Sequence, residues 1–218
     1  MFRRQRSRHA DIPVEIMARE DERRARAQET ILVGGLPGAP GILAAMGLSP
    51  GLAAHLQGLA DTLLVNEFPG TSLSRSQREL LATAVSAAND CFFCMDSHGA
   101  FARELLHREG STSADVLVDG LKEGARTGLD PRMTALVRIA RIVAKNAREL
   151  RKEDVDAALS VGANDADIQL AVLIASAFCM YNRMVDGFRA STPPTVEPYR
   201  ETAAHIADRG YRQPPPPR

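Results

Sequence analysis

The 218-residue sequence has few cysteines, few aromatic residues and no net charge. Its three cysteines are too few for the disulfide framework of a small secreted protein. Tryptophan is absent and aromatic residues make up 5% of the chain, so the residues that favour β-strands are scarce. The 27 basic and 27 acidic side chains balance, which leaves no overall field to attract nucleic acid or an anionic membrane. We therefore expect a globular protein that binds neither.

Long apolar runs are also lacking. The most apolar stretch, residues 168–181, is interrupted by Gln169 and Ser176 and is shorter than the ~20 residues that a membrane span needs. Arg3 and Arg4 are not followed by the apolar segment of a twin-arginine or secretory signal. We expect a cytoplasmic protein, and in a reducing compartment a close pair of cysteines is more often chemical than structural.

Composition divides the chain into three parts. Residues 1–40 are a charged arm and a linker rich in glycine and proline. Within the arm, residues 11–28 are expected to form an exposed helix or to contact a partner subunit, with nucleic-acid binding as the alternative. Residues 41–190 are the predicted helical domain. Residues 191–218 contain many prolines and are expected to form an extended, mobile tail.

The middle part carries helical periodicity almost throughout. Apolar residues recur at spacings of three and four, and no stretch alternates for long enough to be a strand. Helices are expected over residues 52–64, 74–89, 91–108, 111–123, from 130 onward, around 155–159 and over 164–181, with 184–188 continuing the last helix or following a break. Sequence therefore predicts an all-α fold, a bundle of about seven or eight helices.

The segment most informative about chemistry is NDCFFCMDSH, residues 89–98. Cys91 and Cys94 are three residues apart, which at a helix N-terminus brings their sulfurs close enough to form a disulfide. Unpaired amides and the helix dipole stabilise a thiolate there and lower the pKa of a cysteine. His98 follows Cys94 by four residues, so it lies one turn along the same face, within reach of the sulfur directly or through one water. The pattern is typical of an activated thiol with a base and a resolving partner.

Other uses of the cysteine pair stay open. A structural zinc site needs four ligands, and the pair with His98 supplies three, so Cys179, His55 or His107 would have to complete it. A c-type haem needs histidine directly after the second cysteine, where Met95 stands. A buried, reduced pair with no chemical role is the third option. This third option is disfavoured by polar neighbours of the pair, namely Asn89, Asp90, Asp96 and Ser97.

Glu79 has two alternative roles. Ser74 with Gln77 and Ser76 with Glu79 form overlapping capping boxes at the predicted helix start, and capping alone would account for Glu79. Alternatively Glu79 orients and charges His98. Twelve residues of straight helix would separate Glu79 from Cys91 by about 18 Å, so the second role requires the chain to reverse at Asn89–Asp90 or a neighbouring helix to close the gap.

Glu79, eleven intervening residues, and then Cys91, Cys94 and His98 resemble the signature of the alkylhydroperoxidase D-like (AhpD-like) proteins. These proteins belong to the carboxymuconolactone decarboxylase superfamily. The helix after Pro50 and the segment YNRMVDGF, residues 181–188, resemble the longer, peroxidase-related branch of that group. The resemblance covers roughly residues 40–190.

The resemblance implies an all-helical homo-oligomer and a thiol peroxidase or disulfide reductase that needs no cofactor or metal. Cys94 would be the peroxide-reactive thiol, Cys91 the resolving thiol and proton donor, and His98 with Glu79 the proton relay. The implied substrate is a hydroperoxide, and the implied reductant is a dithiol on a lipoyl or thioredoxin-like protein. Phe93 stands where the best-studied pattern has a histidine, so a shorter relay is expected. The alternative is a non-enzymatic zinc-binding or redox-sensing helical protein.

The remaining candidate residues have structural interpretations. Cys179 lies in the most apolar segment and is expected to be a core side chain. Asn182 and Arg183 are expected to cap a helix or to pair across a subunit interface. Three histidines are expected at the surface, namely His55, His107 and His205.

Overall fold

The protein is described by a computed structural model over residue 25, residues 33–125 and residues 128–212. Within these ranges the chain forms helices and no strand, so the all-α prediction is confirmed. The predicted arm at residues 11–28 lies outside the described residues, apart from residue 25. The elements are α2 (Ile42–Gly47), α3 (Pro50–Leu64), α4 (Arg75–Ala88), α5 (Phe92–Arg108), α6 (Ala114–Lys122), α7 (Pro131–Asn146), the 3-10 helix η1 (Ala147–Glu149), α8 (Lys152–Ser160), α9 (Asp165–Phe188) and α10 (Glu197–Arg209).

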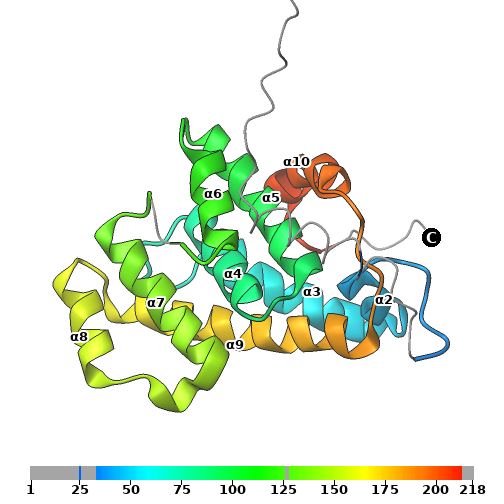
Figure 1. Ribbon diagram of the computed structural model, residues 1–218, viewed down its shortest axis with the longest axis horizontal. Coiled ribbons are helices and arrows are strands. Elements are labelled where there is room, and N and C mark those ends of the chain that lie inside the picture. The colour runs from blue at the N-terminus through cyan, green and yellow to red at the C-terminus, as the bar shows by residue number, and fades with distance from the viewer. Residues whose placement is uncertain (1–24, 26–32, 126–127, 213–218) are drawn as a thin grey trace, which may run out of the picture.

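Helix α4 lies at the centre of the bundle. It packs against α5 on one side and against α7 and α9 on the other, while α6 and α10 cover α5 (Figure 1). Eleven of its fourteen residues are buried, so a polar side chain on this helix must find its partners inside the protein. Glu79 is one of these buried residues.

Two of the three capping boxes that the sequence predicts are formed. Ser74 and Gln77 form a reciprocal capping box at the start of α4, and Asn164 with Asp167 forms another at the start of α9. The predicted second box at Ser76 does not form, because Ser76 lies within the first turn of α4 and not at its N-cap; its hydroxyl donates to a Glu109 carboxylate oxygen at 2.8 Å. Glu79 is therefore not a capping residue in this structure.

Helix α9 is longer than predicted. It runs without a break for 24 residues through Met184 to Phe188, and its most apolar window has a mean hydropathy of 1.4. The expectation that no segment is long enough to span a membrane is therefore wrong by length and composition. In the structure α9 packs on α4 and α7, with Leu170, Ile174 and Phe178 fully buried between them.

The prediction of an extended tail after residue 190 is wrong for residues 197–209. These residues form α10, which packs on α5. Three residues spaced four apart are buried on its inner face, namely Tyr199, Ala203 and Ala207. This apolar stripe stabilises a helix. The prolines do not prevent it, because Pro198 falls in the first turn, where no hydrogen bond is lost. The C-terminal part of the chain is thereby brought to the cysteine segment.

Candidate active site

The chain reverses between α4 and α5, as the relay interpretation of Glu79 requires. Asp90 adopts a left-handed conformation with φ of 56°, which short polar side chains tolerate. The Cys91 amide then donates back to the Ser86 carbonyl at 3.0 Å, and α5 begins at the next residue. Because α5 returns alongside α4, residues far apart in a straight helix become neighbours: Glu79 Oε2 lies 2.7 Å from His98 Nδ1.

Both carboxylate oxygens of Glu79 have a partner. His98 Nδ1 contacts one oxygen, and the hydroxyl of Tyr211 donates to the other, Oε1, at 2.6 Å. Glu79 itself has no solvent-exposed surface. Burial and the neighbouring Glu79 charge raise the pKa of Tyr211 well above its usual value, so the phenol keeps its proton and acts as the donor. Each oxygen of this buried carboxylate is therefore hydrogen-bonded to a side chain, as buried polar atoms require.

The imidazole of His98 is enclosed by aromatic rings. Phe101 and Phe178 meet it edge-on, and Tyr211 stacks on it at an interplanar angle of 29°. With Nδ1 facing the carboxylate, the proton of the neutral ring belongs on Nδ1, and Nε2 is left as the basic nitrogen. Among the described residues His98 makes no direct hydrogen bond to either cysteine sulfur, so of the two expected routes to Cys94 the direct one is not formed.

The two cysteines are reduced and buried at the start of α5. Cys91 occupies the N-cap position and Cys94 lies in the first turn, with 0% and 2% of their surfaces exposed. A hydrogen bond from the Cys91 thiol to Cys94, together with burial, raises the pKa of Cys91 well above its usual value. The expectation that a cysteine at this helix terminus has a lowered pKa is therefore wrong for Cys91. The pair is asymmetric, with Cys91 as the proton-holding partner.

This asymmetry predicts selective alkylation. The thiolate is the reactive form of a cysteine, and the raised pKa keeps Cys91 protonated at neutral pH. Limiting iodoacetamide at pH 7 should therefore modify Cys94 before Cys91, and Cys91 should react only as the pH becomes strongly alkaline. Tandem mass spectrometry that distinguishes the two positions measures the ratio. Equal labelling of both cysteines at pH 7 would contradict the assignment.

An apolar cluster covers the cysteine pair. Cys91 and Cys94 pack with Phe93, Val185 and Tyr199, which come from α5, α9 and α10. Phe93 lies edge-on to Tyr199, and a side chain at Gly41 would overlap the Phe93 ring. Phe93, which stands where the best-studied pattern has a histidine, thus closes the site on the side that faces Tyr199 and Gly41.

The polar residues around the cysteines serve the fold. Asp96 is fully buried and pairs with Lys122 of α6 at 2.9 Å, and the Ser97 hydroxyl donates to the Phe93 carbonyl of its own helix. The cysteines are buried despite these polar neighbours, whose side chains bond to other groups, so the neighbours do not argue against a buried pair. The case for chemistry at the cysteines rests instead on Glu79 and His98.

Asn182 and Cys179 of α9 lie near the chain reversal. Asn89 donates to the Asn182 side-chain oxygen at 2.9 Å and to the Cys179 sulfur at 3.5 Å, and Asn182 donates onward to the Ser86 hydroxyl. Cys179 is half-buried against the main core. Asn182 therefore neither caps α9 nor lies at the surface; it joins α9 to the end of α4.

The three histidines expected at the surface are exposed there: His55, His107 and His205.

No group of three His, Cys, Asp or Glu side chains arranged to hold a metal ion occurs within residues 33–125 and 128–212.

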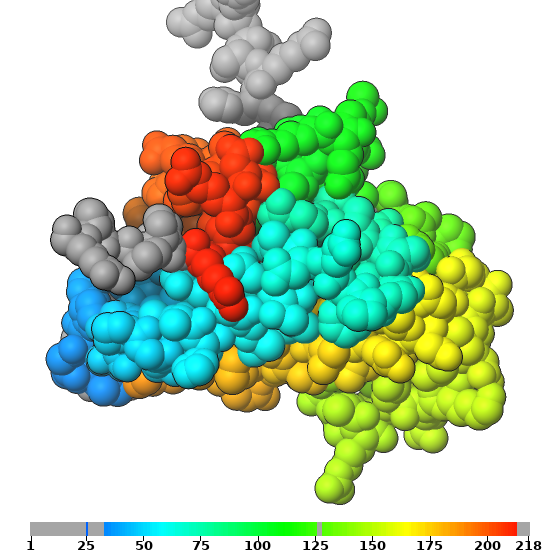
Figure 2. Space-filling view, turned by 180° about the vertical axis from the view of Figure 1, so that it is seen from behind, coloured from blue at the N-terminus to red at the C-terminus, as the bar shows by residue number. Residues whose placement is uncertain are grey.

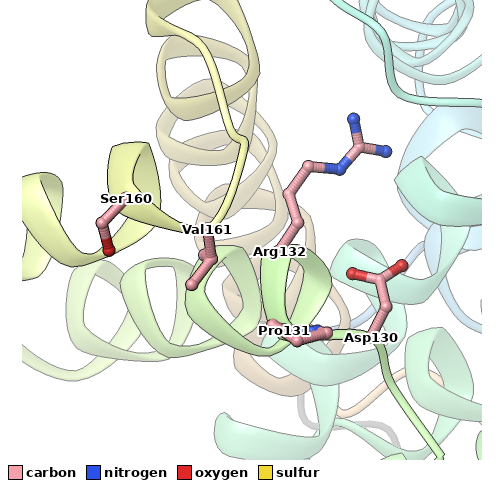
Figure 3. A pocket seen from close by; sticks show the side chains of 5 residues that line it. All are labelled: Asp130, Pro131, Arg132, Ser160 and Val161. Carbon is pink, nitrogen blue, oxygen red and sulfur yellow. The ribbon is translucent and has the colours of Figure 1, made fainter.

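A shallow surface hollow lies where the end of α8 meets the start of α7, and Figure 3 shows Arg132 and Asp130 at its edge. The Asp130 carboxylate caps α7 by accepting from the Met133 amide, and Arg132 donates to Gln77. Since its charged groups serve the fold and none of the four predicted site residues lines it, we do not assign it to the site.

The relay partner that sequence reasoning missed is Tyr211. It falls in the segment expected to be an extended tail, where no contact with Glu79 was predicted. The available signal is the four-residue spacing of Tyr199, Ala203 and Ala207, followed by Gly210 as a helix stop. That pattern predicts an amphipathic helix, but not the place where its end docks.

A sequence model of the carboxymuconolactone decarboxylase family matches residues 50–107, which contain all four predicted site residues. No curated protein matches the chain. Three solved structures share its fold, with TM-scores of 0.60, 0.59 and 0.56.

The first is a peroxidase-related protein from Silicibacter sp. TM1040, 26% identical, covering 69% of this chain and 75% of its own. The second, from Ralstonia eutropha JMP134, is described as an alkylhydroperoxidase AhpD core; it is 24% identical over 88% of this chain and 90% of its own. The third, a protein of unknown function from Agrobacterium tumefaciens, is 18% identical over 68% of this chain and 95% of its own. Residues 50–107 thus match the carboxymuconolactone decarboxylase family, and the chain shares its fold with AhpD-like and peroxidase-related proteins.

Proposed function

We propose that the protein is a thiol-dependent peroxidase in which Cys94 reduces hydroperoxides and Cys91 resolves the product. The observation that carries the proposal is the asymmetric thiol pair one turn before an imidazole that a buried carboxylate orients. Cys91 keeps its proton, and Glu79 holds His98 at 2.7 Å. The AhpD-like and peroxidase-related names of the similar structures support the same reaction class.

The proposed cycle has three balanced steps. The Cys94 thiolate attacks the terminal oxygen of a hydroperoxide, the O–O bond breaks, and the leaving alkoxide takes up a proton, giving a sulfenic acid and an alcohol. The Cys91 thiol then attacks the sulfenic acid sulfur, forming a disulfide and releasing water. An external dithiol, as on a lipoyl or thioredoxin-like protein, reduces the disulfide and is itself oxidised to a disulfide.

His98 and Glu79 would move the protons of this cycle. Nε2 of His98 accepts the proton of the Cys94 thiol through one water, and Glu79 stabilises the resulting imidazolium through Nδ1. The same imidazolium then returns the proton to the leaving alkoxide. Phe93 cannot take part, so the relay consists of the single imidazole and its carboxylate.

The apolar cover sets a condition on this function. Both sulfurs are almost completely buried, so a hydroperoxide reaches Cys94 only when part of the cluster that contains Phe93 and Tyr199 moves aside. An apolar cover of this kind favours an organic hydroperoxide over a highly charged substrate.

The test is hydroperoxide consumption by purified protein with added dithiol, together with metal analysis after mild purification. The proposal predicts dithiol-dependent consumption by protein that contains no stoichiometric metal. Dialysis-resistant zinc at one ion per chain, with no consumption, would favour the zinc-binding alternative. Dithiol-disulfide exchange without consumption of any hydroperoxide would leave a disulfide reductase in its place.

A further inference from the structure

The C-terminal segment reaches into the proposed relay. The residues after α10 run across α3, where Figure 2 shows the red C-terminal end lying over the cyan helices. Two backbone amides of the segment, those of Tyr211 and Arg212, donate to the two carboxylate oxygens of Asp61 on α3, at 2.7 and 3.1 Å. Asp61 is itself almost completely buried, so its side chain fixes the backbone of the segment.

Two further contacts hold α10 in place. Arg75 of α4 donates to the carbonyls of Ile206 and Ala207 at the end of α10, at 3.0 and 2.6 Å. Gly210 turns the chain with φ of 75°, and a Cβ at this position would lie 2.7 Å from the Asp61 carboxylate. Only glycine fits this turn without strain. The docking of the segment is thus specific in both backbone and side-chain contacts.

Docking delivers the Tyr211 side chain to the relay. Its hydroxyl donates to Glu79 Oε1 at 2.6 Å and lies 3.2 Å from His98 Nδ1, while its ring stacks on the imidazole. Arg75, which precedes Glu79 by one turn of α4, holds the end of α10, which leads into the segment with Tyr211. One face of α4 therefore anchors the segment and receives its hydroxyl.

We propose that Tyr211 is a positioning residue of the Glu79–His98 relay, supplied by the C-terminal segment. Glu79 is out of reach of water, so each of its carboxylate oxygens needs a hydrogen-bond donor from the protein itself. The Tyr211 hydroxyl supplies the second donor, which keeps Glu79 an acceptor for the Nδ1 proton and leaves Nε2 basic. The stacked ring prevents the imidazole from rotating away. This inference rests on the proposed function only in assigning the relay to Cys94 chemistry.

A double-mutant cycle tests the proposal. Tyr211→Phe keeps the ring and its cover but removes the hydroxyl, and Glu79→Gln removes the charge that the hydroxyl serves. Two rates are measured at pH 7, alkylation of Cys94 by iodoacetamide and oxidation by a hydroperoxide. Loss of a hydrogen bond to a charged group should lower both rates of Cys94 by about tenfold in Tyr211→Phe. In the Glu79→Gln background the same change should alter the rate by less than about twofold, because the two residues act through one another.

A substitution elsewhere between α5 and α10 serves as the control. Arg108→Ala removes the exposed contacts of α5 with Asp208 on α10 and should leave both rates within about twofold of wild type. Multiplicative effects of the two substitutions on alkylation, or a wild-type alkylation rate in Tyr211→Phe, would overturn the role of Tyr211. A wild-type protein that consumes no hydroperoxide would instead refute the proposed function, while the alkylation cycle would still decide on Tyr211.

Discussion

Replacing Cys94 with serine should reduce hydroperoxide consumption by about a thousandfold or more, because a hydroxyl at this position is a far weaker nucleophile than a thiolate. The exchange is nearly isosteric, and the site is 2% exposed with a thiol donor beside it, so the fold should persist. Circular dichroism and the urea midpoint measure the fold, and a dithiol-coupled assay measures consumption. Retained turnover in Cys94→Ser would remove Cys94 from its assigned role.

The other cysteines are matched controls for this variant. Cys91→Ser should still reduce one equivalent of hydroperoxide and then stop, because the Cys94 sulfenic acid has no resolving thiol; the acid should be trapped by dimedone. Cys179→Ser should keep full turnover, since Cys179 contacts Asn89 and the main core rather than the pair. Loss of turnover in Cys179→Ser without loss of stability would point to a different thiol pair.

Replacing Glu79 with glutamine should lower turnover by about a hundredfold, at the lower end of what general acid–base catalysis contributes. Glutamine keeps the shape of the side chain but cannot stabilise an imidazolium at Nδ1, 2.7 Å away. The expected loss concerns the rate of Cys94 oxidation, measured by stopped-flow thiol loss, with the unfolding midpoint followed in parallel.

A second carboxylate on the same helix pair provides the control. Glu109 accepts a hydrogen bond from Ser76 at 2.8 Å but lies at the exposed end of α5, so Glu109→Gln should leave turnover unchanged. If Glu79→Gln lost stability and kept its turnover, the role of Glu79 would be structural and the relay would have to be abandoned.

Local signals in the sequence predict the fold well. Capping pairs such as Asn164–Asp167 and the periodicity of residues 74–108 define α4, α5 and α9 because caps and apolar stripes act within one or two turns. The close approach of Glu79 to His98 was predicted only conditionally. It depends on the left-handed residue Asp90, whose backbone conformation the sequence favours but does not determine.

The long-range parts of the site could not be predicted from local pattern. Tyr211 meets Glu79 across 132 positions of the chain, through an anchor on Asp61 that has no sequence signature. The prolines after residue 190 favour an extended tail, whereas the spacing of Tyr199 and Ala203 favours a buried helix face. Tertiary packing on α5 decides between the two.

The central claim is that Cys91 and Cys94 form a redox couple driven by hydroperoxide, and the most direct measurement is the oxidation state of this pair. Reduced wild-type protein, free of metal, is mixed with one equivalent of an organic hydroperoxide and analysed by mass spectrometry of unreduced peptides. We predict the loss of two hydrogen atoms, located to a Cys91–Cys94 disulfide that forms as the hydroperoxide disappears. A pair that stays reduced while the hydroperoxide persists would contradict the account.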